Sequence, residues 1–168
     1  MADCKYCEEI EFKVYEDEEM ICFLDQNPVS VGHLVIIPRN HNVIIEQISD
    51  DVFPSLFIMA NKLSAILFDV IGAQGTNILI NNGISAGQEI PHSSINIIPR
   101  KPEDGLSFEW NPKPAQKEDL ESLSKQIIDA LNKKEEPSNP EEKEKKPSEI
   151  KKDEAGMNWV EKALHRLP

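Results

Sequence analysis

One long segment with helical periodicity limits the folds open to this chain more than any other feature. Between residues 52 and 71, apolar side chains recur about every 3.6 positions, the spacing that aligns them along one side of an α-helix. Gly72 follows the segment, and glycine commonly ends helices. Asp50 or Asp51 is a candidate cap at the other end. The segment is therefore expected to be the longest helix of the core.

Short apolar runs on either side of this segment predict β-strands. The run GHLVIIP is rich in β-branched residues and ends at Pro38, which favours a buried strand. Asn81, Asn82 and Gly83 tolerate the positive φ of a tight turn and separate two further runs. Strands are expected at residues 13–15, 20–24, 32–38, 76–80 and 93–98, the last closed by Pro99.

The C-terminal part of the chain divides into a helix, a charged segment and a second helix. Residues 116–131 have helical apolar spacing. Residues 133–155 are mostly charged, and such a segment buries too little surface to offset its ordering entropy, which predicts a disordered linker. Residues 156–168 are expected to form an amphipathic helix that docks on its own domain or on a protein partner, through Trp159, Val160, Leu164 and Leu167.

Length and charge narrow the class of protein. The 168 residues suit a single folded domain, which we place at residues 1–132. The formal net charge of −12 argues against generic nucleic-acid binding, which depends on lysine and arginine, but is compatible with a small pocket for one nucleotide. No apolar run approaches the roughly 20 residues of a membrane span, and the N-terminus does not resemble a signal peptide. We expect a cytoplasmic protein without a membrane partner.

Three cysteines are present, an odd number in a chain without a recognisable secretory signal. A disulfide framework is therefore not expected, and a metal site is the better hypothesis. Cys4 and Cys7 frame a tight C-K-Y-C knuckle, although two free surface thiols would give the same pattern. Cys22 lies inside an apolar run and is expected to be a small buried side chain.

The order of motifs from residue 4 to about residue 100 resembles the histidine triad (HIT) family. ILINNGISAGQEIPHSSINIIPR is similar to the family's C-terminal signature, an Asn-Asn-Gly turn and a Gly-Gln pair before a strand with three alternating histidines. FLDQNPVSVGHLVIIPRNH is similar to an earlier strand pair, and the CxxC followed by KVYEDEEMICFLD to a common opening. The resemblance implies an α+β fold, in which one long helix packs on an antiparallel sheet of about five strands, and a two-fold homodimer.

The sequence departs from the family on the signature strand itself, which reads His92-Ser93-Ser94-Ile95-Asn96. Side chains alternate along a strand, so His92, Ser94 and Asn96 are expected on one face. In active family members the second histidine attacks the α-phosphorus of a nucleotide and forms a nucleotidyl-histidine intermediate, while the third helps to bind the phosphate. Because Ser94 and Asn96 stand at these two positions, no catalytic residue is assigned.

Three hypotheses are compatible with this departure, and the simplest of them is a structural dimer whose pocket is empty. A serine hydroxyl is a weak nucleophile unless a base within about 3 Å takes its proton, and His33 is the candidate base from a neighbouring strand. The leading hypothesis is a catalytically inactive HIT protein that acts as a purine-nucleotide-binding or protein-binding module. The alternative is a nucleotide phosphohydrolase, phosphoramidase or nucleotidyl transferase with Ser94 as an atypical nucleophile. Glu89 replaces a small hydroxyl residue of active members and either opposes a phosphate or points to water.

Some HIT proteins hold a structural zinc through an N-terminal CxxC, a histidine after the IIP strand and the first triad histidine. The counterparts in this chain are Cys4, Cys7, His41 and His92. Two thiolates and two imidazoles complete the tetrahedral shell of a closed zinc site. Such a site would tie the N-terminus to the signature strand, and its binding energy would add to folding energy.

Several other positions match family residues that contact a nucleotide. Asp25, Asn81 and Gln88 correspond to contacts with ribose or phosphate, although Asp25 and Asn81 are also explained as turn residues. His33 is either a pocket residue or a hydrogen-bonded core histidine. The expected ligand is a purine mononucleotide, and its candidate binding residues are Asp25, His33, Asn81, Gln88, Ser94 and Asn96.

Overall fold

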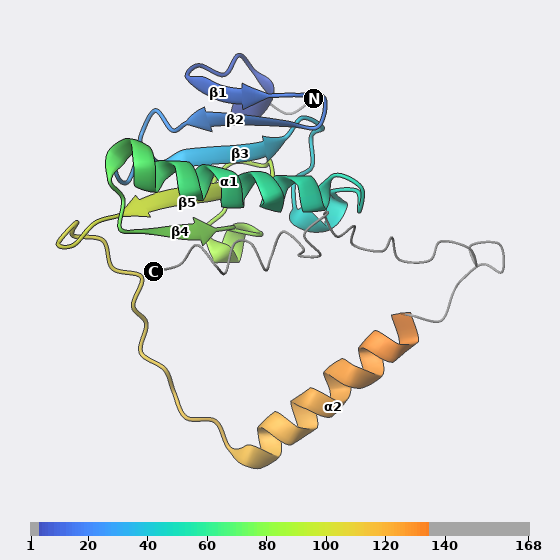
Figure 1. Cartoon of the computed structure of the whole chain (residues 1–168). Helices are drawn as coiled ribbons and strands as arrows, with labels where there is room; N and C mark the ends of the chain where they lie inside the picture. The colour runs from blue at the N-terminus through green and yellow to red at the C-terminus, as the bar shows by residue number, and fades with distance from the viewer. Residues whose placement is uncertain (1–3, 135–168) are drawn as a thin grey trace, which may run out of the picture. The chain divides into compact units, whose positions relative to one another are not determined.

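A computed structural model describes residues 4–134 of the chain and contains one five-stranded antiparallel sheet (Figure 1). The strand order is β1-β2-β3-β5-β4, and every neighbouring pair is antiparallel. This confirms the expected α+β class with about five strands. The strands are β1 (Lys13–Glu16), β2 (Met20–Leu24), β3 (Leu34–Pro38), β4 (Gly75–Leu79) and β5 (Ile95–Arg100).

The expected core helix is α1 (Phe53–Ile71), which crosses one face of the sheet (Figure 1). It ends at Gly72 in the left-handed conformation, with φ of 63°, as a C-terminal glycine permits. The predicted aspartate cap is wrong. Val52 occupies the cap position and makes no side-chain cap hydrogen bond, while Pro54 in the first turn has its φ preset for a helix. The side chains that α1 buries follow helical spacing, namely Leu56, Ala60, Leu63 and Leu67.

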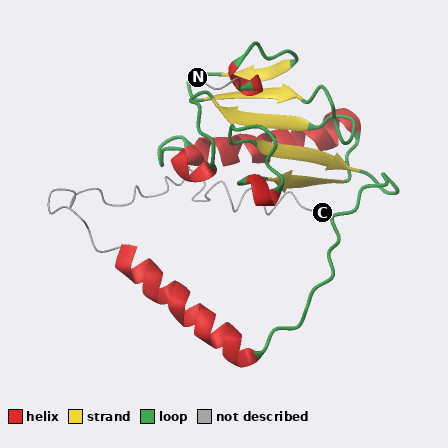
Figure 2. Ribbon diagram, turned by 180° about the vertical axis from the view of Figure 1, so that it is seen from behind, coloured by secondary structure: helices red, strands yellow, loops and turns green. Residues whose placement is uncertain are grey.

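The sheet buries apolar side chains on both faces because its strands alternate. Met20, Cys22 and Ile36 belong to the cluster that packs with α1, which confirms that Cys22 is buried. Ile21, Phe23, Val35 and Ile37 form a second cluster on the opposite face. Tyr6 and Ile10, from the N-terminal segment, pack against this second cluster. Figure 2, seen from behind, shows that loops and short helical turns, rather than a long helix, lie over this face.

Strand β5 is shifted relative to the prediction. It begins at Ile95 instead of Ser93 and continues through Pro99 to Arg100. The pairing of β5 with β3 extends only from Ile95 to Ile97, so Pro99 lies beyond it and its missing N–H costs no hydrogen bond to β3. The Ser93 N–H instead donates to the Asn42 carbonyl at 2.6 Å. The signature histidine and the serine two residues later therefore lie in the loop that leads into β5.

The chain divides into two compact units, Met1–Phe108 and Glu109–Pro168. The sheet and α1 form the first unit, and the expected later helix is α2 (Lys117–Lys134) in the second. The predicted domain boundary at residue 132 stays a prediction. The predicted linker beyond residue 134 and the terminal helix with Trp159 lie outside the described residues. One side of α2 carries exposed apolar residues, namely Leu120, Leu123, Ile127, Ile128 and Leu131.

Candidate functional site

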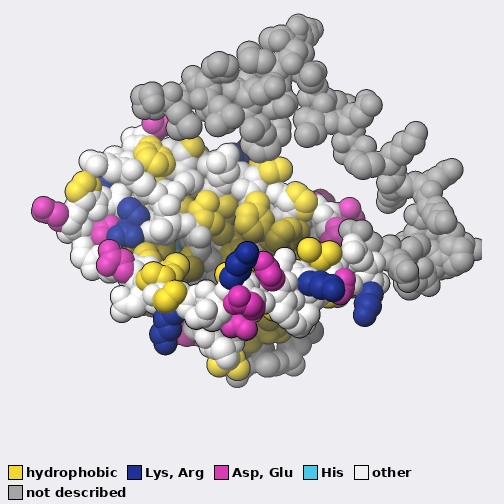
Figure 3. All heavy atoms as spheres, turned by 90° about the horizontal axis from the view of Figure 1, so that it is seen from below, with side chains coloured by type: hydrophobic (Ala, Val, Ile, Leu, Met, Phe, Trp, Pro, Cys, Tyr) yellow, Lys and Arg dark blue, Asp and Glu magenta, His cyan; other side chains and the backbone are white. Residues whose placement is uncertain are grey.

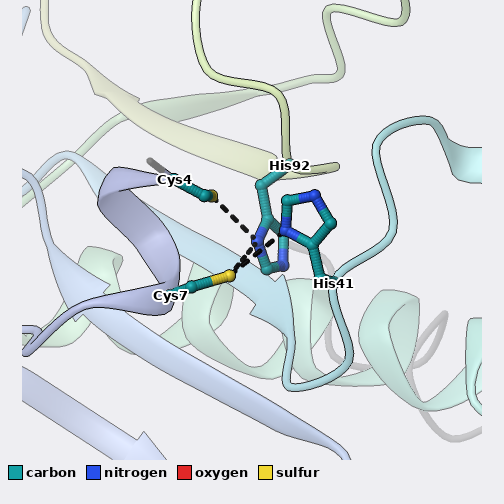
Figure 4. Close-up of side chains that lie close together, drawn as sticks. All are labelled: Cys4, Cys7, His41 and His92. Carbon is teal, nitrogen blue, oxygen red and sulfur yellow. Dashed lines mark hydrogen bonds between the residues drawn. The ribbon is translucent and has the colours of Figure 1, made fainter. Parts of the chain in front are cut away.

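The four predicted metal ligands lie together at one end of the sheet (Figure 4). Cys4 and Cys7 flank the short 3-10 turn η1 (Lys5–Cys7), His41 follows β3, and His92 precedes β5. Their ligand atoms all lie within 4.8 Å of one another. The fold thus gathers into one cluster four residues that are separated by up to 88 positions in the chain.

The spacing of the cluster fits a tetrahedral metal. The Nδ1 atom of His92 lies 3.6 Å from the sulfur atoms of both Cys4 and Cys7. The Nδ1 atom of His41 lies 3.2 Å from the Cys7 sulfur. In a tetrahedral zinc site with Zn–S bonds of about 2.3 Å and Zn–N bonds of about 2.0 Å, a sulfur and a nitrogen ligand are about 3.5 Å apart. The observed distances match this value, so the cluster can hold a metal ion.

The hydrogen bond at the far side of the His92 ring fixes the nitrogen that is available to a metal. Nε2 lies 2.9 Å from the Pro38 carbonyl, and because a carbonyl only accepts, Nε2 must carry the proton. In the neutral ring Nδ1 then has a free lone pair directed at the cysteines. His92 is only 1% exposed, and burial lowers its pKa, which favours this neutral form.

A short turn brings the two thiols together. The Cys7 N–H donates to the Cys4 carbonyl at 2.9 Å and closes the turn that brings the sulfur atoms together. Burial, followed by the neighbouring Cys4 side chain, raises the pKa of Cys7 above its ordinary value. A bound divalent cation opposes this shift because it stabilises the thiolates. Two sulfur and two imidazole donors suit zinc better than a hard, oxygen-seeking cation.

A cleft of about 550 Å³ opens on the sheet face opposite α1. This volume is in the range of small-molecule sites. All six residues predicted to bind a nucleotide line it, and they come from the position after β2, the position before β3, the loop between β4 and β5, and the strand β5. They are Asp25, His33, Asn81, Gln88, Ser94 and Asn96.

His33 connects two of these residues at the base of the cleft. Its Nε2 lies 3.1 Å from Oδ1 of Asn96, whose own Nδ2 donates to the Leu79 carbonyl at 3.4 Å. Because that amide oxygen can only accept, Nε2 of His33 is the donor. Nδ1 lies 3.7 Å from an Asp25 carboxylate oxygen and has no hydrogen-bond partner among the described residues. His33 is therefore both hydrogen-bonded and a cleft residue, with one ring nitrogen left to accept.

Gln88 and Asn81 hold the loop that borders the cleft. The Gln88 amide donates to the carbonyls of Val43 at 2.7 Å and Ile90 at 2.9 Å, and its oxygen accepts from the Gly83 N–H at 2.8 Å. Asn81 donates to the Gly87 carbonyl at 3.2 Å. These bonds keep the loop in place through backbone contacts. Direct contact of either side chain with a nucleotide stays a prediction.

The sequence patterns did not reveal one side of the cleft. Lys5, Tyr6, Glu8, Glu9 and Glu11 also line it, and all of them belong to the N-terminal segment around the cysteines. The Tyr6 ring contacts Phe23 with centroids 5.5 Å apart and His92 at 6.0 Å. Burial and then the charges of Asp25, Cys4 and Glu89 raise the pKa of Tyr6 to about 12, so its hydroxyl stays protonated. Only the apolar character of Tyr6 and Ile10 hinted that this segment packs on the sheet.

Comparison with known proteins identifies the family of the sheet unit. The family described as HIT domain matches residues 7–103. An Arabidopsis thaliana protein named adenylylsulfatase HINT3 is 38% identical over 109 residues, which is 62% of this chain and 55% of that protein. A Candida albicans protein named adenosine 5′-monophosphoramidase HNT1 is 32% identical over 134 residues, covering 74% of this chain and 86% of that protein.

Solved structures agree with this match. A HIT family protein from Bacillus subtilis is 32% identical, with a TM-score of 0.70, and the match covers 76% of this chain and 96% of that one. A zinc-bound histidine triad family protein from Mycobacterium smegmatis is 26% identical, with a TM-score of 0.59 over 79% of this chain and 97% of that one.

Proposed function

Because the chain belongs to the HIT family, we propose that it is a zinc-containing, catalytically inactive member that binds a purine nucleotide in the cleft beside β5. The observation that carries the proposal is the composition of that cleft. Among its described lining residues His33 is the only histidine. Ser94 and Asn96 also line it, at the positions where the sequence resemblance expects the reactive and phosphate-binding imidazoles.

The geometry supports binding without catalysis. Asn96 receives the His33 Nε2–H, so that ring nitrogen carries a proton and is not a base toward Ser94. Nδ1 of His33 is buried beside Asp25 instead. Asp25, Asn81 and the hydroxyl of Ser94 offer hydrogen bonds to a ribose and a phosphate. A purine base can pack on the apolar side chains of Phe23 and Ile90, which line the same cleft.

A binding and turnover experiment on the full chain tests this proposal. Calorimetry with AMP and GMP is expected to give saturable binding, and the Asn96→Ala variant should bind at least fivefold more weakly because it loses a cleft hydrogen bond, worth about 1 kcal/mol. Adenosine 5′-phosphoramidates are expected to show no turnover above the uncatalysed rate. Ser85→Ala, in the exposed turn η3 (Ile84–Ala86), is the matched control.

The alternative function is catalysis by Ser94. The names of two relatives, an adenylylsulfatase and an adenosine 5′-monophosphoramidase, support it, because both describe reactions at a nucleotide phosphorus. Robust turnover by the unaltered chain that disappears in Ser94→Ala would establish the alternative and reject the inactive assignment. Absence of binding to either mononucleotide would reject the nucleotide site itself.

We place the zinc between Cys4, Cys7, His41 and His92, where it would supply a structural cross-link rather than a reactive water. Four protein donors fill a tetrahedral shell and leave no open position for substrate. The cross-link would join the N-terminal segment to the loop after β3, which carries His41, and to the loop before β5, which carries His92. The zinc-bound relative from Mycobacterium smegmatis supports the choice of metal.

A homodimer is the proposed assembly, and one edge of the sheet supports it. Strand β4 lies at the end of the sheet, and the Ser64 hydroxyl of α1 bonds to Thr76 on this strand. Phe57 and Phe68 lie on the same side of α1 as Ser64, at helical spacing, and are 38% and 44% exposed. Ile78 on β4 is 47% exposed. In the view from below, hydrophobic side chains gather at the centre of the visible face (Figure 3).

Helix α1 is also long and apolar enough to cross a membrane by length and composition alone. A second copy of the chain explains its outward apolar residues without a membrane. Phe68→Glu is expected to convert the dimer to a monomer in sedimentation equilibrium, because it places a charge in an apolar contact. Val70→Glu, an exposed position on the opposite side of α1, should leave the dimer intact. A monomeric unaltered chain would refute the assembly.

The remaining expectations stay proposals. A protein partner is proposed for residues 156–168, which lie outside the described residues, and the cytoplasm is the proposed location.

A further inference from the structure

Charge around the cleft is strongly uneven. Five carboxylates line it, and among the described residues that do so Lys5 alone carries a positive charge. The acidic residues come from three separate parts of the chain, so the arrangement does not depend on one local sequence. They are Glu8, Glu9, Glu11, Asp25 and Glu89.

The interior of the cleft also contains a hydrogen-bond acceptor, Nδ1 of His33, that receives no hydrogen bond from the described residues. His33 is 6% exposed, and its Nδ1 has no hydrogen-bond partner among the described residues. The bond from Nε2 to Asn96 fixes Nδ1 as the acceptor of the neutral ring. An Asp25 carboxylate oxygen lies 3.7 Å from Nδ1 and also accepts. A ligand that donates N–H or O–H groups at this point would satisfy both atoms.

The residues that would face a phosphate are neutral. Ser94 and Asn96 supply a hydroxyl and an amide where active relatives supply imidazoles that can carry positive charge. Glu89, which follows the Gly87–Gln88 pair, lines the same cleft. Each phosphate group added to a ligand therefore increases its repulsion from five carboxylates, which only one lysine among the described lining residues opposes.

We propose that the cleft selects purine nucleosides that carry a cationic amino group at the 5′ position and discriminates against nucleoside polyphosphates. Glu9 and Glu89 are assigned as specificity-determining residues, one from the N-terminal segment and one from the loop between β4 and β5. This inference rests on the proposed nucleotide-binding function and defines the charge of its ligand. The ammonium of such a ligand would lie among the carboxylates and donate toward Asp25 and Nδ1 of His33.

Calorimetry of the full chain with four probes tests this selectivity. The probes are adenosine, 5′-amino-5′-deoxyadenosine, AMP and ATP, each measured at low and at high salt. The aminonucleoside is expected to bind about tenfold more tightly than AMP at low salt, and ATP more weakly than AMP. The difference should shrink at high salt, because exposed carboxylates are screened.

Charge-neutralising variants locate the effect. The double variant Glu9→Gln and Glu89→Gln keeps the side-chain size and is expected to reduce the preference for the aminonucleoside over AMP by at least threefold. Glu18→Gln, an exposed acid in the turn between β1 and β2, removes the same charge away from the cleft and is the matched control. It should leave the preference unchanged.

The outcomes separate this inference from the function on which it rests. Binding of adenosine together with tighter binding of AMP or ATP than of the aminonucleoside would overturn the charge selectivity and leave the nucleotide site standing. If the double variant and the unaltered chain prefer the aminonucleoside over AMP to the same extent, Glu9 and Glu89 do not determine the specificity. Failure of all four probes to bind would refute the nucleotide-binding function itself.

Discussion

Cys4→Ser is expected to remove the bound metal and to lower the unfolding temperature by roughly 12 °C or more. Structural zinc contributes about 10–16 kcal/mol to the folding of small zinc-finger peptides. This domain has its own core between the sheet and α1, so a loss of about 3 kcal/mol is the reasonable minimum, and each kcal/mol corresponds to about 4–8 °C in a domain of this size. Calorimetric unfolding, paired with elemental analysis of the purified chain, measures both changes.

Lys5→Ser is the matched control for this experiment. Lys5 lies between the two cysteines and is exposed, so the substitution alters the same turn without removing a ligand. It should keep one equivalent of zinc and unfold within about 2 °C of the unaltered chain, as surface substitutions usually do. The metal site would be rejected if elemental analysis found no metal in the purified full chain and the Cys4→Ser variant unfolded at the same temperature as the control.

Restoring two histidines is expected to restore catalysis. The double variant Ser94→His and Asn96→His should hydrolyse an adenosine 5′-phosphoramidate at least about 100-fold faster than the unaltered chain, since acid–base and nucleophilic groups each contribute factors of this order. Both positions line the cleft that we assign to the nucleotide. The rate of AMP formation, followed in a quenched time course, measures the gain. Mass spectrometry of the quenched protein detects the trapped nucleotidyl-histidine.

Two further variants make this gain interpretable. Asn96→His alone supplies a phosphate-binding imidazole without a nucleophile and should remain inactive. Ser85→His adds a histidine in the exposed turn η3 and should also remain inactive, which excludes catalysis by any additional imidazole. Turnover by the unaltered chain equal to that of the double variant would refute the proposed inactivity, and a double variant without turnover would refute the role of the two histidines.

The metal cluster and much of the fold could be predicted from the sequence because their signals are local or carried by a family pattern. The apolar spacing of α1 and the glycine after it fixed that helix to within one residue. Cys4 and Cys7 are three residues apart, and His41 and His92 each follow or precede a recognisable strand. The six predicted nucleotide-binding residues, all of which line the cleft, were chosen in the same way, from family motifs at the ends of strands.

Features that depend on tertiary packing could not be predicted. The acidic side of the cleft exists because Tyr6 and Ile10 pack on Phe23 and its neighbours, and this brings Glu9 to the cleft. The start of β5 depends on the length of its pairing with β3, which sequence alone does not give. The His92 tautomer depends on the Pro38 carbonyl, a backbone group that no side-chain pattern reveals.

The N-terminal segment contributes to both sites. It carries Cys4 and Cys7, two of the four candidate metal ligands, and it also forms one side of the cleft. With a metal bound, the cysteine ligands would hold this side of the cleft in place. An oxidant that forms a disulfide between Cys4 and Cys7 would release the metal and this constraint. Peroxide or zinc starvation would then loosen that side of the cleft without touching a ligand-binding residue. Occupancy of the cavity would thereby follow the redox state and metal supply of the cell.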